Sequence, residues 1–140
     1  MMKQLMFGAV ILLATACSVE STPVVAEQSP TAPVGALVGT LTIDWTIDGT
    51  TDPNRCNASV ASTISIEVFR SDGVSAGVFE QACQTFATSI TLGEGNYSAN
   101  ATLLDAAGQP RTTSVAINPF TIIGNQELRI PIDFPSSSFF

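Results

Sequence analysis

The sequence contains no histidine, and its single lysine, Lys3, lies near the start of the chain. Histidine and lysine are the side chains that most often activate a nucleophile or accept a proton near neutral pH. Their scarcity weighs against hydrolases built on an activated serine or cysteine. The three cysteines form no Cys-x-x-Cys pair, so they do not match the usual zinc or redox motifs, and a histidine-containing zinc site is excluded.

Positive charge is also scarce. The chain carries 5 basic against 12 acidic residues, for a net charge of −7. From Cys17 onward the only basic side chains are four arginines: Arg55, Arg70, Arg111 and Arg129. An acidic surface without a basic run repels nucleic acid phosphates and anionic lipid headgroups, so we expect neither as a partner.

No apolar run near the N-terminus is long enough to span a membrane. The run over residues 5–13 is far below the roughly 18 to 20 residues that a spanning helix needs. Lys3 precedes this run, and the small residues Ala14, Thr15 and Ala16 follow it. A charged start, a short apolar middle and small residues at the end are typical of a secretory signal peptide.

Residues 13–17, Leu-Ala-Thr-Ala-Cys, resemble a bacterial lipobox, with Ala14 where leucine is commonest. The resemblance implies that residues 1–16 are a lipoprotein signal peptide and that Cys17 becomes the acylated first residue, which anchors the protein to a membrane. Ser18 after the cysteine implies the outer membrane, by similarity to Gram-negative lipoproteins. The alternative is an ordinary signal peptide cleaved elsewhere.

We interpret residues 17–35 as the acylated cysteine followed by a flexible tether. After Cys17 this segment is rich in proline, serine and threonine and has no apolar period. A flexible coil of about 18 residues has a root-mean-square reach of roughly 20 to 25 Å. Such a tether would hold a domain clear of the headgroups without fixing its orientation.

Cys56 and Cys83 remain as a pair once Cys17 carries lipid. Secretion places them in an oxidising compartment, where a disulfide is the default interpretation. Closing a loop of about 27 residues is worth ~3 to 4 kcal/mol by the chain-entropy estimate. A reactive thiol pair is the alternative.

Residues 36–140 are long enough for one hydrophobic core and too short for a second. Apolar residues alternate with polar ones in seven short runs separated by turn signals: 37–47, 63–70, 77–83, 86–92, 97–103, 112–117 and 128–134. No segment shows a helical period. This pattern predicts an all-β, seven-stranded antiparallel β-sandwich. Pro119 and Pro131 cannot donate to a sheet ladder and indicate edges, bulges or strand starts, and we expect the last strand at a sheet edge.

Residues 92–110 resemble a strand pair of immunoglobulin-like and transthyretin-like sandwich modules of bacterial surface proteins. The matching positions are Gly95 and Tyr97 at the strand start and Asp105 and Gly108 in the following turn. Trp45 precedes both cysteines, unlike the tryptophan of antibody domains. The whole chain resembles predicted lipoproteins of Gram-negative soil bacteria, a resemblance that implies no activity.

Asp48, Asp52 and Asn54 form a weak candidate calcium site in the loop after the first run, because Ca²⁺ prefers oxygen ligands. No glutamate closes the loop at calcium-loop spacing, and such residues also build ordinary turns. We therefore expect no metal and no cofactor.

The sequence predicts a non-catalytic binding or structural module of the cell envelope, with its loops and last strand contacting an unknown protein or glycan. We expect Phe139 and Phe140 to pack on the sandwich or to bind a neighbour. Two alternatives remain: a small envelope hydrolase using paired carboxylates, and a calcium-binding adhesion module. A pocket with two carboxylates about 5 to 10 Å apart would favour the hydrolase.

Overall fold

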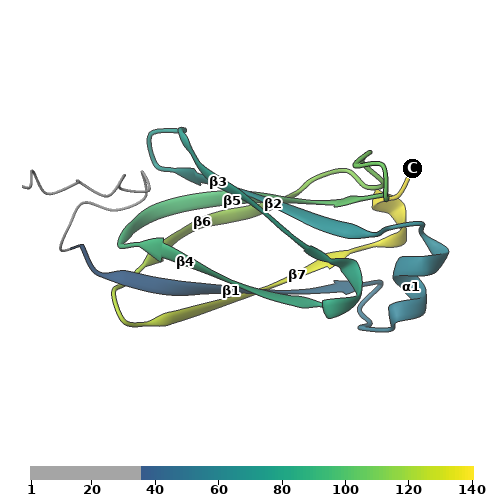
Figure 1. The fold of residues 1–140 in the computed structure, drawn as a ribbon, viewed down its shortest axis with the longest axis horizontal. Coiled ribbons are helices and arrows are strands. Elements are labelled where there is room, and N and C mark those ends of the chain that lie inside the picture. Colours follow the sequence, from purple (N-terminus) through teal and green to yellow (C-terminus); the bar gives the residue numbers. More distant parts are fainter. Residues whose placement is uncertain (1–35) are drawn as a thin grey trace, which may run out of the picture.

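The computed structural model describes residues 36–140 (Figure 1). The predicted signal peptide, Cys17 and the predicted tether, residues 1–35, lie outside the described residues. The seven strands are β1 (Val38–Ile47), β2 (Thr63–Arg70), β3 (Ser75–Ala82), β4 (Ala87–Gly93), β5 (Gly95–Leu104), β6 (Val115–Ile122) and β7 (Glu127–Phe134). The helical elements are α1 (Pro53–Ala58) and the 3₁₀ turns η1 (Cys83–Thr85) and η2 (Ser136–Ser138).

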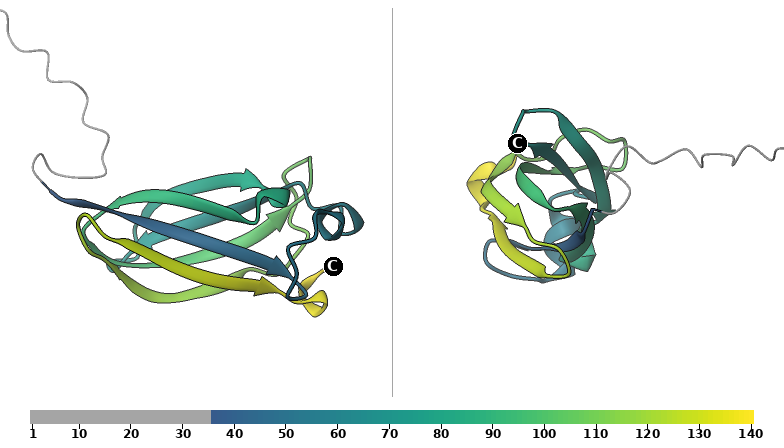
Figure 2. Two further views of the ribbon diagram at one scale, coloured as in Figure 1. Left: turned by 90° about the horizontal axis from the view of Figure 1, so that it is seen from below. Right: turned by 90° about the vertical axis from the view of Figure 1, so that its left-hand side faces the viewer.

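The strands form two sheets, of order β4-β1-β7 and β3-β2-β5-β6. The sheets face each other and enclose the core (Figures 1 and 2). The all-β sandwich of seven strands predicted from the period-two pattern is confirmed.

One strand pairing differs from the expected antiparallel arrangement. β1 and β4 pair antiparallel, as do neighbouring strands throughout the other sheet, but β1 and β7 are parallel. The parallel register places Ile47 opposite Phe134. The segments that follow these two strands therefore leave the sandwich at the same end.

The core consists of the inward faces of both sheets. In β1, Leu41, Ile43, Trp45 and Ile47 are buried, as their spacing predicts. The expected face included Leu37, but that side chain is 49% exposed because β1 begins one residue later and Leu37 precedes the sheet.

Proline marks the edges as expected. Pro119 lies in β6 and Pro131 in β7, each at the edge of its sheet within residues 36–140. The expectation that the last strand is an edge strand is confirmed. Strand β6 begins at Val115, later than predicted, and continues through Pro119 to Ile122 because an edge position tolerates the missing N–H.

The helix α1 was not expected from the sequence. Asp52 caps it, because its side chain accepts a hydrogen bond from the Asn54 amide, and Pro53 occupies the first turn. With six residues, α1 is too short to display a helical period. No helix of residues 36–140 has the length and apolar character needed to cross a membrane.

Cys56 of α1 and Cys83 after β3 form the predicted disulfide. Both residues are fully buried. The disulfide fastens α1 to the end of the sandwich, beside Trp45. The ring centroids of Trp45 and Phe86 are 6.4 Å apart. Phe86 adopts a left-handed backbone conformation, with φ of 55°, so β4 begins at Ala87.

The positions that carry the resemblance to sandwich modules have defined structural roles. The Tyr97 hydroxyl donates a 2.8 Å hydrogen bond to the Gly93 carbonyl, which fixes the turn between β4 and β5. Burial raises the pKa of Tyr97 and favours its neutral form. Asp105 accepts hydrogen bonds from the amides of Ala107 and Gln109 and so shapes the turn after β5.

The sandwich is elongated and has two different ends (Figure 2). One end carries the start of β1 and the turn between β6 and β7. The opposite end carries α1 and the last residues of the chain.

Candidate functional site: a pocket at the α1 end

A pocket of 290 Å³ opens at the α1 end of the sandwich. Its lining comes from four separate segments: Ile47 and Asp48; Arg55, Ala58 and Ser59; Arg111; and Ser136, Phe139 and Phe140. We call it the α1-end pocket. It is slightly smaller than the roughly 300 to 1,000 Å³ of drug-sized ligand sites, so it would hold a small ligand or one group of a larger ligand.

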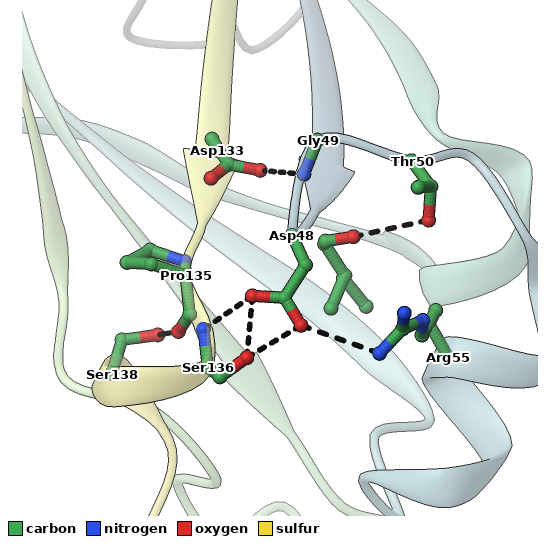
Figure 3. A network of polar contacts seen from close by, with 9 residues as sticks. Asp48, Gly49, Thr50, Arg55, Asp133, Pro135, Ser136 and Ser138 are labelled. Atoms are coloured by element: carbon green, nitrogen blue, oxygen red, sulfur yellow. Dashed lines mark hydrogen bonds and ion pairs between the residues drawn. The ribbon is translucent and has the colours of Figure 1, made fainter.

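A tight turn after β1 forms one wall. Asp48 and Gly49 both have positive φ, 49° and 71°, and Ile47 and Thr50 exchange backbone hydrogen bonds across them. Asp-Gly at these two positions is typical of a type I′ hairpin turn. Asp133 of β7 holds the turn by accepting a 2.8 Å hydrogen bond from the Gly49 amide (Figure 3).

The Asp48 side chain joins this turn to the C-terminal segment (Figure 3). The Ser136 hydroxyl lies 2.5 Å from both carboxylate oxygens of Asp48, and the Ser136 amide donates to Oδ1 at 2.6 Å. Arg55 Nη1 lies 3.3 Å from Oδ2. The hydrogen bonds from the Ser136 side chain and backbone, followed by the charge of Arg55, hold the pKa of Asp48 below its ordinary value of 3.8.

Arg111 forms the second charged wall. Its amide donates to the Leu103 carbonyl at 2.7 Å and its own carbonyl accepts from the Phe140 amide, which fixes its backbone. Its side-chain Nε donates to the Ser59 carbonyl at 3.3 Å. Among residues 36–140, Arg111 is the one arginine without a carboxylate within 4.0 Å, since Arg55, Arg70 and Arg129 each have one.

The aromatic pair at the end of the chain completes the pocket. Phe139 forms an isolated β-bridge with Thr112 and packs partly buried against the core, whereas Phe140 is 72% exposed. The expectation that this pair packs or binds thus divides between its members: Phe139 packs, and Phe140 offers a ring to the surface.

The candidate calcium residues make separate hydrogen bonds within the protein. Asp48 is turned toward Ser136 and Arg55, while Asp52 caps α1 through the Asn54 amide. In residues 36–140, no group of three histidine, cysteine or acidic residues is arranged to hold a metal ion. Arg55 lies beside the Asp48 carboxylate and would oppose a cation placed there, which weighs against Ca²⁺ binding at Asp48.

The pocket also lacks the arrangement expected of a carboxylate-based hydrolase, because Asp48 is the one acidic residue in its lining as described. Ser136 lies beside a carboxylate whose lowered pKa makes it a weak proton acceptor. A pocket with two arginines, one ionised carboxylate paired with an arginine and an exposed aromatic ring is suited to binding.

Sequence reasoning did not find Arg55, Arg111 or Ser136. The signal in the sequence is weak, because they lie in segments far apart along the chain and meet only through the parallel pairing of β1 with β7 and the bridge between Thr112 and Phe139.

The fold and the pocket define a disulfide-linked, seven-stranded β-sandwich with a small polar cavity at one end. No family model matches the sequence, and no curated protein sequence matches it. Among solved structures, the chain is similar to GBS52, the minor pilin of the Gram-positive pathogen Streptococcus agalactiae, at 17% identity and a TM-score of 0.48. That match covers 71% of this chain and 45% of the pilin.

A second similar structure is a leucine-rich repeat protein from Bacteroides thetaiotaomicron, at 18% identity and a TM-score of 0.42. The match covers 72% of this chain and 14% of that one. This chain therefore spans less than half the length of either protein. Similarity at this level assigns no function to the chain.

Proposed function

We propose that this protein is a lipoprotein of the bacterial outer membrane, anchored through acylated Cys17. Its β-sandwich is a non-catalytic binding module for a protein or glycan of the cell envelope. The observation that carries the proposal is the position of the α1-end pocket, at the opposite end of the sandwich from the start of β1.

In this arrangement the tether joins the sandwich at the end opposite to the pocket. Residues 17–35 join the sandwich next to Ala36, before β1, and β1 has 10 residues. At about 3.3 Å per residue, such a strand separates its two ends by roughly 30 Å. A tether attached at one end therefore leaves the pocket at the other end free to meet a ligand.

The tether end of the sandwich carries exposed apolar side chains. Leu37, Val38, Val74 and Ile123 are large apolar side chains that are about half exposed. All four lie at or beside the start of β1 or in the turns at that end, after β2 and β6. Because residues 17–35 join the sandwich at this end, these side chains lie nearer to the tether than the α1-end pocket does.

The chemistry of the pocket supports binding over catalysis. The sequence supplies no histidine, and the carboxylate beside the Ser136 hydroxyl is stabilised in its charged form. Proton transfer from a serine to such a carboxylate is unfavourable, because an efficient general base has a pKa near the working pH.

Metabolic labelling tests the anchor. Cells fed an alkyne-bearing fatty acid should label the wild-type protein, whereas Cys17→Ser should remove the label and release or stall the protein. Ser18→Ala keeps the cysteine and is the matched control. Equal labelling of Cys17→Ser and the wild type would refute lipidation at Cys17.

Photo-cross-linking tests the binding module. A photoreactive phenylalanine analogue at Phe140, in the pocket, should capture an envelope component in intact cells. The same analogue at Val78, which is 57% exposed on β3, should not. Equal capture at both positions, or none at Phe140, would contradict the assignment of the α1 end as the binding surface.

A further inference from the structure

The α1-end pocket contains a positive charge that the described protein does not neutralise. Arg55 is paired with Asp48, but no carboxylate of residues 36–140 lies within 4.0 Å of the Arg111 guanidinium. Arginine has five N–H donors, and the one hydrogen bond from this guanidinium to residues 36–140 is made by Nε to Ser59. The outer N–H groups are thus available to a ligand.

This arrangement is unusual for so acidic a chain. Twelve carboxylates are available against five basic residues, and the other three arginines of the sandwich each lie beside an aspartate. At physiological salt the Debye length is about 8 Å, so distant carboxylates are screened. The charges that act on a ligand are those of the lining: Asp48, which Arg55 offsets, and Arg111. The preferred partner of a planar guanidinium with free outer N–H groups is a carboxylate or phosphate.

The remaining lining indicates what else the ligand carries. Phe140 offers an exposed ring, and Phe139 lies beside it in the wall. The Asp48 carboxylate, though bonded to Ser136, is 29% exposed and can accept a further hydrogen bond from a ligand hydroxyl. A ligand with an anionic group, an apolar face and hydroxyl donors matches all three features.

We propose that the α1-end pocket binds the carboxylate of an acidic sugar residue, such as a uronic acid, as part of a larger glycan. The carboxylate pairs with Arg111, the C–H face of the ring lies on Phe140, and hydroxyl groups donate to Asp48. This inference rests on the proposed binding function and names its ligand class. The 290 Å³ pocket is the right size for one sugar ring of a chain that continues into solvent.

Saturation-transfer NMR on the full-length lipidated protein in detergent micelles tests the proposal, with D-glucuronate as the probe and D-glucose as its neutral counterpart. Glucuronate should bind at least tenfold more tightly than glucose, because one charge-assisted hydrogen-bonded pair is lost with glucose. Its affinity should fall as salt rises. Equal binding of the two sugars, or binding of neither, would overturn the assignment.

Variants locate the site. Arg111→Gln should weaken glucuronate binding about tenfold or more. Arg129→Gln removes an arginine of β7 that is paired with Asp44 of β1, and it should leave the binding unchanged. Phe140→Ala removes a largely exposed ring and cannot disrupt the core, so a loss of binding in this variant does not reflect unfolding. Undiminished binding in both pocket variants would refute the site.

Two further probes separate the sugar from its carboxylate. If acetate, or an N-acetylated dialanine with a free carboxyl end, binds as tightly as glucuronate, the pocket recognises a carboxylate alone and the saccharide assignment is wrong. Capture by the photoreactive group at Phe140 without glucuronate binding would preserve the binding module and reject its acidic-sugar ligand. Failure of both experiments would reject the proposed function as well.

Discussion

The indole N–H of Trp45 donates a 2.9 Å hydrogen bond to the backbone carbonyl of Cys83. Trp45 is completely buried, and Cys83 is one half of the disulfide. This hydrogen bond therefore connects the centre of the core to the disulfide that holds α1. The hydrogen bond and the disulfide stabilise the same end of the sandwich.

Trp45→Ala should lower the free energy of unfolding by about 3 to 5 kcal/mol, the usual range for removing a large buried aromatic side chain. Trp45→Phe keeps most of the apolar volume but leaves the Cys83 carbonyl without its donor, and we expect an intermediate loss. Urea unfolding measures both changes. A loss below about 1 kcal/mol in the alanine variant would be incompatible with a buried Trp45.

Removal of the disulfide by the double substitution Cys56→Ala and Cys83→Ala should lower the free energy of unfolding by about 3 to 4 kcal/mol, since the unfolded chain regains the entropy of an open loop. Mass spectrometry without reductant should find the peptides around the two cysteines linked in the wild type. Full alkylation of both thiols in the native, unreduced protein would show that the bond is absent.

Asp48 predicts a dependence of stability on pH. Its pKa is lower in the folded state than its ordinary value of 3.8, so its contribution is complete above that pH and is lost as the pH falls through the folded pKa. The stability difference between the wild type and Asp48→Asn should therefore be largest near neutral pH and shrink in acid.

The control for Asp48 is Ser136→Ala, which removes the hydroxyl that contributes most to the lowered pKa. At neutral pH, thermal unfolding should show a smaller stability difference between Ser136→Ala and the Ser136→Ala/Asp48→Asn double variant than between the wild type and Asp48→Asn. A stability difference between wild type and Asp48→Asn that stays constant from neutral pH into acid would rule out this coupling.

Gly39 predicts a steric effect at the opposite end. A Cβ there would overlap the Ile123 carbonyl oxygen and would lie 2.8 Å from the Ile122 side chain. Gly39→Ala should cost about 1 to 3 kcal/mol, as overpacking usually does, because backbone cannot move aside easily. Val38→Ala, at the neighbouring exposed side chain, should change stability by less than about 0.5 kcal/mol. Equal denaturation midpoints for both variants would contradict the close approach.

Much of the fold follows from the alternation of apolar residues. Period two places Ile64, Ile66 and Val68 on one face of β2, and all three are completely buried. Alternation reports which face of a strand is inward, but not which strand pairs with it or in which direction. The parallel pairing of β1 with β7 was therefore not predictable from this pattern.

The helix α1 and the α1-end pocket were missed for different reasons. The Asp52-Pro53 sequence is a recognisable helix start, but six residues give no period to confirm it. Arg111 carries no local signal at all, because an arginine in a loop is usually solvated. Only its position beside Ser59 and Phe140, set by long-range strand pairing, distinguishes it from the other arginines.

The pairing of β1 with β7 also has a consequence for the order in which the protein folds. It joins residues 87 positions apart, such as Thr46 and Asp133, and β1 is the central strand of its sheet. Non-local pairing of this kind is slow to form, because the loop must close before its contacts stabilise it. The β4-β1-β7 sheet therefore cannot be completed before β7 has been synthesised, although β1 and β4 and the four strands of the other sheet are available earlier.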